Sequence, residues 1–382
     1  MLSRTFNAFF DSEKSSGILL VLCTVISIAI ANSPVGESYL DFWHSRVGTL
    51  SLEHWINDAL MAIFFLLIGL ELEREIYVGE LSNFKNALLP IFAAIGGMAF
   101  PALIHFSLNA GSPTQTGIGI PMATDIAFAL GVLAILGNRV PASLKVFVVA
   151  FAVIDDLGAI VIIAAVYTAK LSIGYLGGAA AVWILLVTLN RIFRVTRLMP
   201  YLLGGIVMWF LMLKSGVHAT VAGVMLAFAI PFSAKDDDQD SPSHRLENWL
   251  HKPVAFIILP IFSLANTGIV IQADWFQHLA TANSIGIAAG LIAGKPLGVM
   301  ILCFVAVASG ICRLPSDLRW SHVVGAGFLG GIGFTMSIFI TNLAFSTDPA
   351  IITTSKIAIL LASLSSAVLG FLWLWFSGKA AT

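Results

Sequence analysis

Charge is scarce in this chain of 382 residues. Asp, Glu, Lys and Arg together make up 11% of the residues, whereas 58% are hydrophobic and the mean hydropathy is +0.94. A soluble domain of this length needs a charged surface to stay dispersed, so the composition excludes that class of protein. The net charge of −1 gives no basis for binding nucleic acid or an acidic partner.

Cysteine and processing signals are scarce as well. Cys23, Cys303 and Cys312 lie in or beside apolar runs without a paired spacing, which indicates small core residues and excludes a disulfide or thiolate-metal framework. The first apolar run, from about Ser16, is not followed by a small-residue cleavage site. We therefore expect a retained first helix.

Long apolar runs are what the chain has in abundance. Runs of roughly 17–25 residues suffice to cross a hydrocarbon core of about 30 Å, and in lipid they must be helical to satisfy their backbone hydrogen bonds. The sequence predicts an all-α polytopic membrane protein with about 12 spans in one domain over residues 1–382, with an acidic cytoplasmic loop at about 233–252. The expected spans are 15–32, 55–77, 87–107, 118–137, 142–168, 173–190, 199–213, 216–232, 253–271, 284–308, 322–345 and 354–377.

The basic residues set the orientation. Of the 20 Lys and Arg residues, only Arg46, Lys170, Lys214 and Lys356 fall on one side, Lys295 lies inside a span, and all others fall on the side that holds both termini. Basic residues accumulate on the cytoplasmic side of membrane proteins. Both termini are therefore predicted to be cytoplasmic, which also requires an even number of spans.

Two expected helices carry residues that interrupt helices, at matching places in oppositely oriented triplets. The fourth span contains Pro121 close to Asp125, and the eleventh contains Gly330, Gly331 and Gly333. An interrupted helix in the middle of spans 3–5 and another in the middle of spans 10–12 indicate inverted repeats of a transporter. Close helix packing is an alternative explanation for the glycines.

Four ionisable residues lie deep inside apolar runs: Asp125, Asp155, Asp156 and Lys295. Each charge at the bilayer centre costs about 2.5–3.5 kcal/mol, so four unpaired charges would cost roughly 10 kcal/mol. A structural ion pair between Lys295 and one aspartate would explain two of them and would leave two acids without a cation. The set therefore indicates a functional site.

The adjacent Asp155 and Asp156 give the sharpest signal. Neighbours on a helix point about 100° apart, so one can meet a fixed partner while the other faces a water-filled path. Buried carboxylates this close titrate as a coupled pair. A carboxylate that holds either a proton or a hard cation is the minimal exchanger, and its oxygens suit Na⁺ or Li⁺.

Lys295 and Asp125 have predicted supporting roles. Lys295 precedes Pro296, which removes a backbone donor, and it would serve as counter-ion to Asp155. Asp125 would compensate the positive ends of facing helices, with Thr124 offering an oxygen on the cation path.

Polar residues near the span ends form a weaker candidate group for a titrating cluster at the cytoplasmic entrance. A solvated helix end is the favoured interpretation from sequence, and a packing role is equally compatible with His218. The candidates are Glu71, Arg74, Glu75, Arg245, Glu247, His251 and His218.

Six segments in order give the chain a family resemblance. They are WINDALMA (55–62), ATDIAFALG (123–131), DDLGA (155–159), KSGVHAT (214–220), GKPLG (294–298) and GIGFTMSI (331–338). Together they resemble the NhaA-type sodium/proton antiporters over nearly the whole chain. Interrupted helices in inverted repeats are typical of that family, so they are not independent support for the resemblance.

The resemblance implies a specific fold and activity. It implies twelve helices with spans 4 and 11 unwound and crossing, with Gly331 and Gly333 at the unwound point. It implies electrogenic exchange of cytoplasmic Na⁺ or Li⁺ for entering H⁺ without a cofactor, in a bacterial inner membrane. Asp155 and Asp156 would bind the cation and protons, Lys295 would pair with Asp155, and Asp125 with Lys295 would offset helix dipoles.

The resemblance further implies regulation and assembly. Activation by alkaline pH would involve Glu71, Arg74, Glu75, Arg245, Glu247 and His251, although acidic Glu73 departs from the pattern and leaves the switching pH open. A homodimer would form through an extracytoplasmic β-hairpin at about residues 40–54.

Three other functions compete with this prediction. An intramembrane aspartyl protease needs two aspartates on separate helices, which an adjacent doublet does not supply. A sodium-coupled carrier of organic anions would need donors for the anion, and only Lys295 is present. A channel fits deep coupled carboxylates poorly.

Overall fold

A computed structural model describes residues 13–168, 171–233, 241–271 and 275–377 of the chain. Almost all of these residues are helical. Within these residues, nine helices are long and apolar enough to cross a membrane, and the number rises to eleven if two bent helix pairs each count as one span. The prediction of an all-α polytopic membrane protein is confirmed. Both chain ends lie outside the described residues.

The expected eighth span is the one that the described chain does not form. Residues 216–232 contain only α11 (Val221–Ala227), a helix of 7 residues. At 1.5 Å per residue it covers about 10 Å, roughly a third of a hydrocarbon core. Gly216 ends the preceding helix in the left-handed conformation (φ 86°), and Pro231 follows α11 without a backbone donor.

The expected ninth span begins earlier than its sequence suggests. Ser241 caps α12 (Pro242–Pro253) by accepting from the His244 N–H, with Pro242 in the first turn. The helix continues through η5 (Val254–Ile258) and α13 (Leu259–Asn266). The segment from Pro242 to Lys252 is thus helical, where a loop was predicted, because a serine cap and an N-terminal proline start a helix regardless of its polarity. Asp236, Asp237 and Asp238 of the predicted acidic loop lie outside the described residues.

The chain divides into two compact units. Unit 1 comprises residues 1–36, 83–159 and 266–382, and unit 2 comprises residues 37–82 and 160–265. Both predicted repeat triplets therefore fall largely in unit 1. The elements of unit 1 are α2 (Glu13–Ala31), α6 (Phe84–Asn109), η3 (Pro113–Met122), α7 (Ile126–Leu136), η4 (Gly137–Arg139), most of α8 (Ala142–Val166), α14 (Trp275–His278), α15 (Ala282–Ala289), η6 (Gly290–Gly294), α16 (Lys295–Ala308), α17 (Trp320–Gly330), α18 (Phe334–Ala344) and α19 (Pro349–Ser377).

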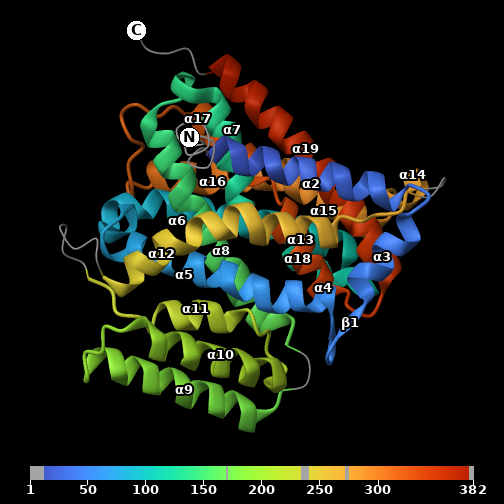
Figure 1. Cartoon of the computed structure of the whole chain (residues 1–382). Helices are drawn as coiled ribbons and strands as arrows, with labels where there is room; N and C mark the ends of the chain where they lie inside the picture. The colour runs from blue at the N-terminus through green and yellow to red at the C-terminus, as the bar shows by residue number, and fades with distance from the viewer. Residues whose placement is uncertain (1–12, 169–170, 234–240, 272–274, 378–382) are drawn as a thin grey trace, which may run out of the picture. The chain divides into compact units, whose positions relative to one another are not determined.

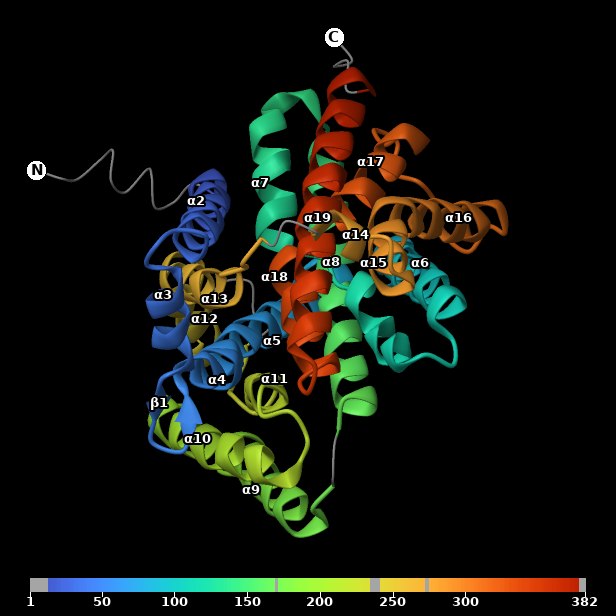
Figure 2. The same ribbon diagram turned by 90° about the vertical axis from the view of Figure 1, so that its right-hand side faces the viewer.

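In unit 1, α6 and α16 lie side by side (Figures 1 and 2) and contact each other closely. A β-carbon at Gly96 of α6 would collide with the backbone of Gly298 on α16, and the converse also holds. Small residues allow this approach between helices in lipid. Figure 2 shows α19 running alongside α17 and α18, which it contacts. Phe147 and Phe151 stack within the core of unit 1, with their ring centroids 6.4 Å apart.

Unit 2 contains a short β-hairpin and a layer of helices. In the hairpin, β1 (Arg46–Val47) pairs antiparallel with β2 (Leu50–Ser51), and Gly48 turns the chain with φ 71°. Figure 1 shows α9, α10 and α11 side by side. The remaining elements are α3 (Gly36–His44), α4 (Leu52–Trp55), η1 (Ile56–Leu60), α5 (Met61–Tyr77), η2 (Glu80–Ser82), α9 (Ile173–Arg191) and α10 (Leu198–Ser215), with α11, α12, η5 and α13 as above.

Candidate functional site

The two interrupted helices of unit 1 meet at their breaks. The first break, residues 123–125, separates η3 from α7, and the second, residues 331–333, separates α17 from α18 with a bend of 46°. The Asp125 N–H donates to the Ile332 carbonyl at 2.6 Å, and Ser337 Oγ donates to the Ile120 carbonyl at 2.7 Å. The predicted interruption of both helices is confirmed, and the two breaks are in direct contact.

Gly331 and Gly333 occupy the second break for reasons of space. Their φ angles are −71° and −91°, which any residue can adopt. A β-carbon on Gly331 would collide with the Leu291 carbonyl of η6, and one on Gly333 would collide with the Ser337 side chain. The glycines therefore allow neighbouring backbone and side chains to approach, and the left-handed region plays no part.

Asp125 joins the N-termini of two half-helices. Its carboxylate caps α7 by accepting from the Phe128 N–H at 3.2 Å through Oδ1. Its Oδ2 accepts from the Thr335 N–H at 3.1 Å, in the first turn of α18, and from the Thr335 hydroxyl. Helix N-termini carry partial positive charge, so one carboxylate stabilises both. Its side chain is 2% exposed.

Asp155, Lys295 and Thr124 form a fully buried triad. Lys295 Nζ donates to Asp155 Oδ2 and to Thr124 Oγ1, the latter at 2.7 Å. Thr124 Oγ1 lies 2.6 Å from Asp155 Oδ2 and 2.8 Å from the Gly330 carbonyl, so its single hydrogen can satisfy one of these acceptors at a time. Asp155 Oδ1 has no hydrogen-bond partner among the described residues.

Asp156 lies next to this triad on α8 with an exposure of 1%. It lies near enough to Lys295 for their charges to attract, so the ammonium that is bonded to Asp155 also interacts with Asp156. Two carboxylates and one ammonium leave the group one negative charge in excess when all are ionised. Binding of either a proton or a cation neutralises this excess negative charge.

The local backbone around Lys295 reflects the proline after it. Lys295 is the first residue of α16 and follows the π-helix η6, which ends at Gly294. Pro296 cannot donate a backbone hydrogen bond, and the wider π turn accommodates that loss. The ammonium lies 5.7 Å from the ring centroid of Phe151, within cation–π range.

The buried acids do not form a multi-ligand transition-metal site. In the described ranges, no group of three or more His, Cys, Asp and Glu side chains could hold a metal ion. Carboxylate and hydroxyl oxygens at Asp155, Asp156 and Thr124 are instead ligands of the kind that hard monovalent cations accept.

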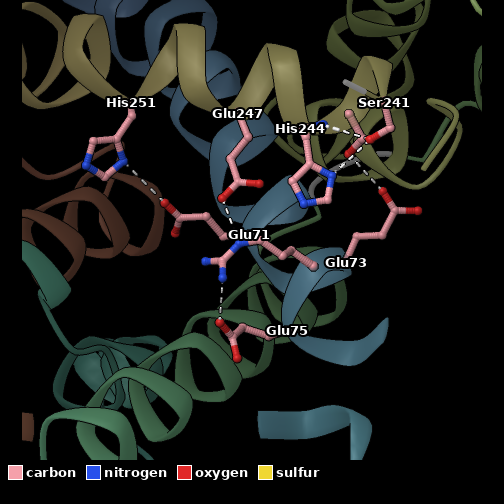
Figure 3. A network of polar contacts seen from close by, with 9 residues as sticks. Glu71, Glu73, Glu75, Ser241, His244, Glu247 and His251 are labelled. Carbon is pink, nitrogen blue, oxygen red and sulfur yellow. Dashed lines mark hydrogen bonds and ion pairs between the residues drawn. The ribbon is translucent and has the colours of Figure 1, made fainter. Parts of the chain in front are cut away.

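A second charged group lies within unit 2, between α5 and α12 (Figure 3). Arg74 pairs with Glu247 at 2.9 Å and with Glu75 at 3.1 Å, and His251 lies 3.7 Å from Glu71. The side chains of Arg74 and His251 are 37% and 65% exposed. We call Glu71, Arg74, Glu75, Glu247 and His251 the α5–α12 cluster.

Two candidates of the predicted entrance group, Arg245 and His218, lie outside the α5–α12 cluster, and so does Glu73, which was not among the candidates. Arg245 is exposed on α12. Glu73 is buried (3% exposed) and accepts from the Ser243 hydroxyl at 3.2 Å. His218 lies 4.0 Å from Asp58. Asp58 precedes Glu71 by thirteen residues, which is about 20 Å along a helix, so His218 belongs to a different region of unit 2.

Sequence reasoning missed Thr335 and Gly330 as site residues. Thr335 gives two donors to Asp125, and the Gly330 carbonyl accepts from Thr124. The signal for Thr335 was its position two residues after Gly333, where the first turn of a half-helix exposes unpaired N–H groups.

Nearly the whole chain matches known proteins of one family. Residues 7–374 match the family model described as Na+/H+ antiporter 1. A protein named Na(+)/H(+) antiporter NhaA from Dechloromonas aromatica is 70% identical over 98% of this chain and 96% of its own length. Proteins of the same name from Cytophaga hutchinsonii (98% and 95% coverage) and Vibrio campbellii (97% and 94%) are 59% and 49% identical. The chain belongs to the Na+/H+ antiporter 1 family.

Proposed function

We propose that this chain exchanges Na⁺ for H⁺ across a membrane, and that Asp155 and Asp156 bind both in turn. The observation that carries the proposal is the pair of adjacent carboxylates, 0% and 1% exposed, with one buried lysine on the first of them. Such a group is expensive to keep in a membrane protein unless it serves transport. Its position beside two interrupted helices supports the same function.

Competition for the carboxylates would couple the two ions. With both acids ionised, the pair attracts a cation, and Thr124 Oγ1 and Asp155 Oδ1 offer oxygens near it. Protonation removes that charge and releases the cation. Because a carboxylate oxygen cannot hold a proton and a cation at once, the ions alternate on the site.

Lys295 would act as the internal counter-ion. While Asp155 is ionised, Lys295 Nζ donates to it and neutralises half of the doublet. When a cation binds or Asp155 takes a proton, Lys295 loses part of this stabilisation and can turn towards Thr124, to which it already donates. Asp125 would keep the two half-helix ends together whichever ion is bound, through its bonds to α7 and α18.

The same proposal covers the ion selectivity, direction, location, regulation and assembly of the transporter. Exchange would be electrogenic, would accept Li⁺ as well as Na⁺, and would export the cation from the cytoplasm. The protein would lie in the bacterial inner membrane with cytoplasmic termini, its two units working as one transporter. The α5–α12 cluster would tune the pH of activation, and β1 and β2 would join two copies in a homodimer.

Proton efflux from everted membrane vesicles tests the proposal. Respiration acidifies the vesicle interior, and Na⁺, Li⁺ or K⁺ is added across a range of pH while a pH-sensitive dye reports the gradient. Na⁺ and Li⁺ are expected to relieve quenching in the wild type and in Asp317→Asn, which changes an exposed aspartate. Asp156→Asn is expected to give no response at equal membrane abundance. A wild type without any cation response would refute antiport.

Sodium-coupled uptake of an organic anion, a competing function from the sequence, is favoured by none of these observations, although Lys295 is a buried cation. Labelled carboxylate uptake driven by a Na⁺ gradient would support it. Because Lys295 is already bonded to Asp155, we expect no such uptake.

A further inference from the structure

A second buried polar group lies in unit 1, among α6, η3, α15 and α19. His105 Nε2 on α6 lies 3.1 Å from Asn283 Oδ1 on α15, and Asn283 Nδ2 donates to Ser355 Oγ on α19 at 2.8 Å. All three side chains are between 0% and 3% exposed. Three helices are thus linked through one chain of hydrogen bonds.

The same group extends to the start of η3 through Asn109. Asn109 Nδ2 donates to the carbonyls of His105 (2.9 Å) and Ala282 (3.1 Å), and its Oδ1 accepts from Thr114 Oγ1 at 2.6 Å. We call His105, Asn109, Thr114, Asn283 and Ser355 the His105 network.

The imidazole also fixes the space beside η3. A β-carbon on Gly117 of η3 would come within 3.1 Å of His105 Cε1, and one on Gly286 of α15 within 3.0 Å of His105 Cδ2. The ring therefore fits between two glycines, and its width sets how closely η3 approaches α15. An aliphatic side chain would fill the space differently and would donate no hydrogen bond.

The segment that the network contacts needs such support. η3 is a 3₁₀ helix of 10 residues, whereas 3₁₀ runs beyond three or four residues are uncommon because their hydrogen bonds are poorly aligned. It leads directly into the break that carries Thr124, whose hydroxyl contacts Asp155 and Lys295. The position of η3 therefore decides where Thr124 lies.

The hydrogen-bond pattern assigns a neutral ring. Because Asn283 Nδ2 donates to Ser355, its Oδ1 is the acceptor, so His105 Nε2 carries the proton. Nδ1 is buried without a hydrogen-bond partner among the described residues. The sequences of η3 and α15 contain no ionisable residue, α6 contributes Lys85 near its start, and α19 contributes Lys356 beside Ser355. No carboxylate on these elements would stabilise a charged imidazole.

We propose that His105 is a positioning residue for cation exchange: its neutral ring donates to Asn283 on α15 and packs against η3, and it thereby fixes where η3, and through it Thr124, lies relative to α15 and α19. This inference rests on the proposed function. It predicts that the donor at Nε2 matters and that titration of the ring does not.

The test compares His105→Leu with His105→Gln in everted vesicles, with Na⁺ varied at each pH. His105→Leu is expected to raise the apparent KM for Na⁺ about tenfold with little loss of the maximal response, because the carboxylates remain while Thr124 is displaced. His105→Gln retains an N–H that can reach Asn283, and it is expected to stay within about twofold of the wild type with an unchanged pH profile. Ser107→Ala is the matched control, because Ser107 is an exposed residue of the same helix whose hydroxyl donates to the Ile104 carbonyl of that helix.

A second variant covers failure of His105→Leu to insert. Thr114→Val keeps the side-chain shape and removes the hydroxyl bonded to Asn109, and it is expected to raise the KM about threefold. An unchanged KM in these variants would overturn the proposal, and so would a pH profile shifted by His105→Gln. Absence of a Na⁺ response in the wild type would instead contradict the proposed function.

Discussion

The two units hold their charges in opposite ways. In unit 1, Asp125, Asp155, Asp156 and Lys295 are at most 2% exposed, so protein groups rather than bulk water surround their charges. In unit 2, Arg74 and His251 of the α5–α12 cluster are 37% and 65% exposed, so water shares in their solvation. Removing one partner in unit 1 leaves an uncompensated charge, whereas water can replace a lost partner in unit 2. The same residue types are therefore suited to ion binding in one unit and to tuning in the other.

Neutralising Asp156 should have the largest effect of the substitutions proposed in either unit. Asp156→Asn keeps the side-chain shape and removes the second charge of the doublet, so cation-driven proton movement should fall at least about 100-fold. The dye response in vesicles measures it, with Asp317→Asn as control. A variant that retains more than about a tenth of the wild-type rate would contradict the role given to the doublet.

Lys295→Met should have the next largest effect, on stability. It leaves Asp155 buried without its cation, and breaking a buried pair in this way costs about 3–5 kcal/mol. The free energy of unfolding can be measured by titrating purified protein with SDS in mixed micelles. Asp155→Asn combined with Lys295→Met should recover most of the loss and stay inactive. Equal stability of the single and double variants would show that the pair does not behave as a buried salt bridge.

Thr335→Val should have an intermediate effect within unit 1. It removes a hydroxyl that donates to the Asp125 carboxylate and leaves the Thr335 N–H bond intact, and hydrogen bonds to charged groups contribute about 1.5–3 kcal/mol. Thr341→Val is the matched control, because its hydroxyl donates to a neutral carbonyl of Ser337 on the same helix. Unfolding of the two variants in parallel should show the larger loss for Thr335→Val, and the reverse order would contradict the account of Asp125.

Glu247→Gln should have the smallest effect on stability, at most about 1 kcal/mol, because its partner Arg74 is partly exposed and also pairs with Glu75. The substitution should leave the maximal rate of exchange unchanged and should shift only its pH profile. Removing one negative charge from the α5–α12 cluster makes further loss of protons from the transporter electrostatically easier, so the profile should move towards acid pH by less than about one unit. A lost maximum would place Glu247 in the transport step.

The cost of buried charge made the centre of the site predictable. Because an unpaired buried charge is costly, a lysine and an aspartate inside apolar runs were expected to pair, and Lys295 does donate to Asp155. The two interruptions followed from Pro121 and the glycines of the eleventh span. Thr335 escaped prediction because its partner, Asp125, is 210 residues away, and only the folded chain brings them together.

Lengths and edges of spans were less predictable. The segment 216–232 is apolar enough for a span, yet Gly216 and Pro231 restrict its helix to Val221–Ala227. Hydropathy counts apolar residues and takes no account of where the backbone can continue a helix. The early start at Pro242 came from a serine cap on a polar stretch, which a hydropathy window assigns to a loop.

Binding of labelled Na⁺ to the purified protein, measured at a series of pH values, tests most directly whether cation and proton compete for the aspartate doublet. If they compete, the apparent Kd for Na⁺ rises as the pH falls, approaching about tenfold per pH unit for each competing proton. Asp155→Asn and Asp156→Asn should each abolish this pH-dependent binding. Na⁺ binding that is independent of pH, or that survives in both variants, would contradict this competition.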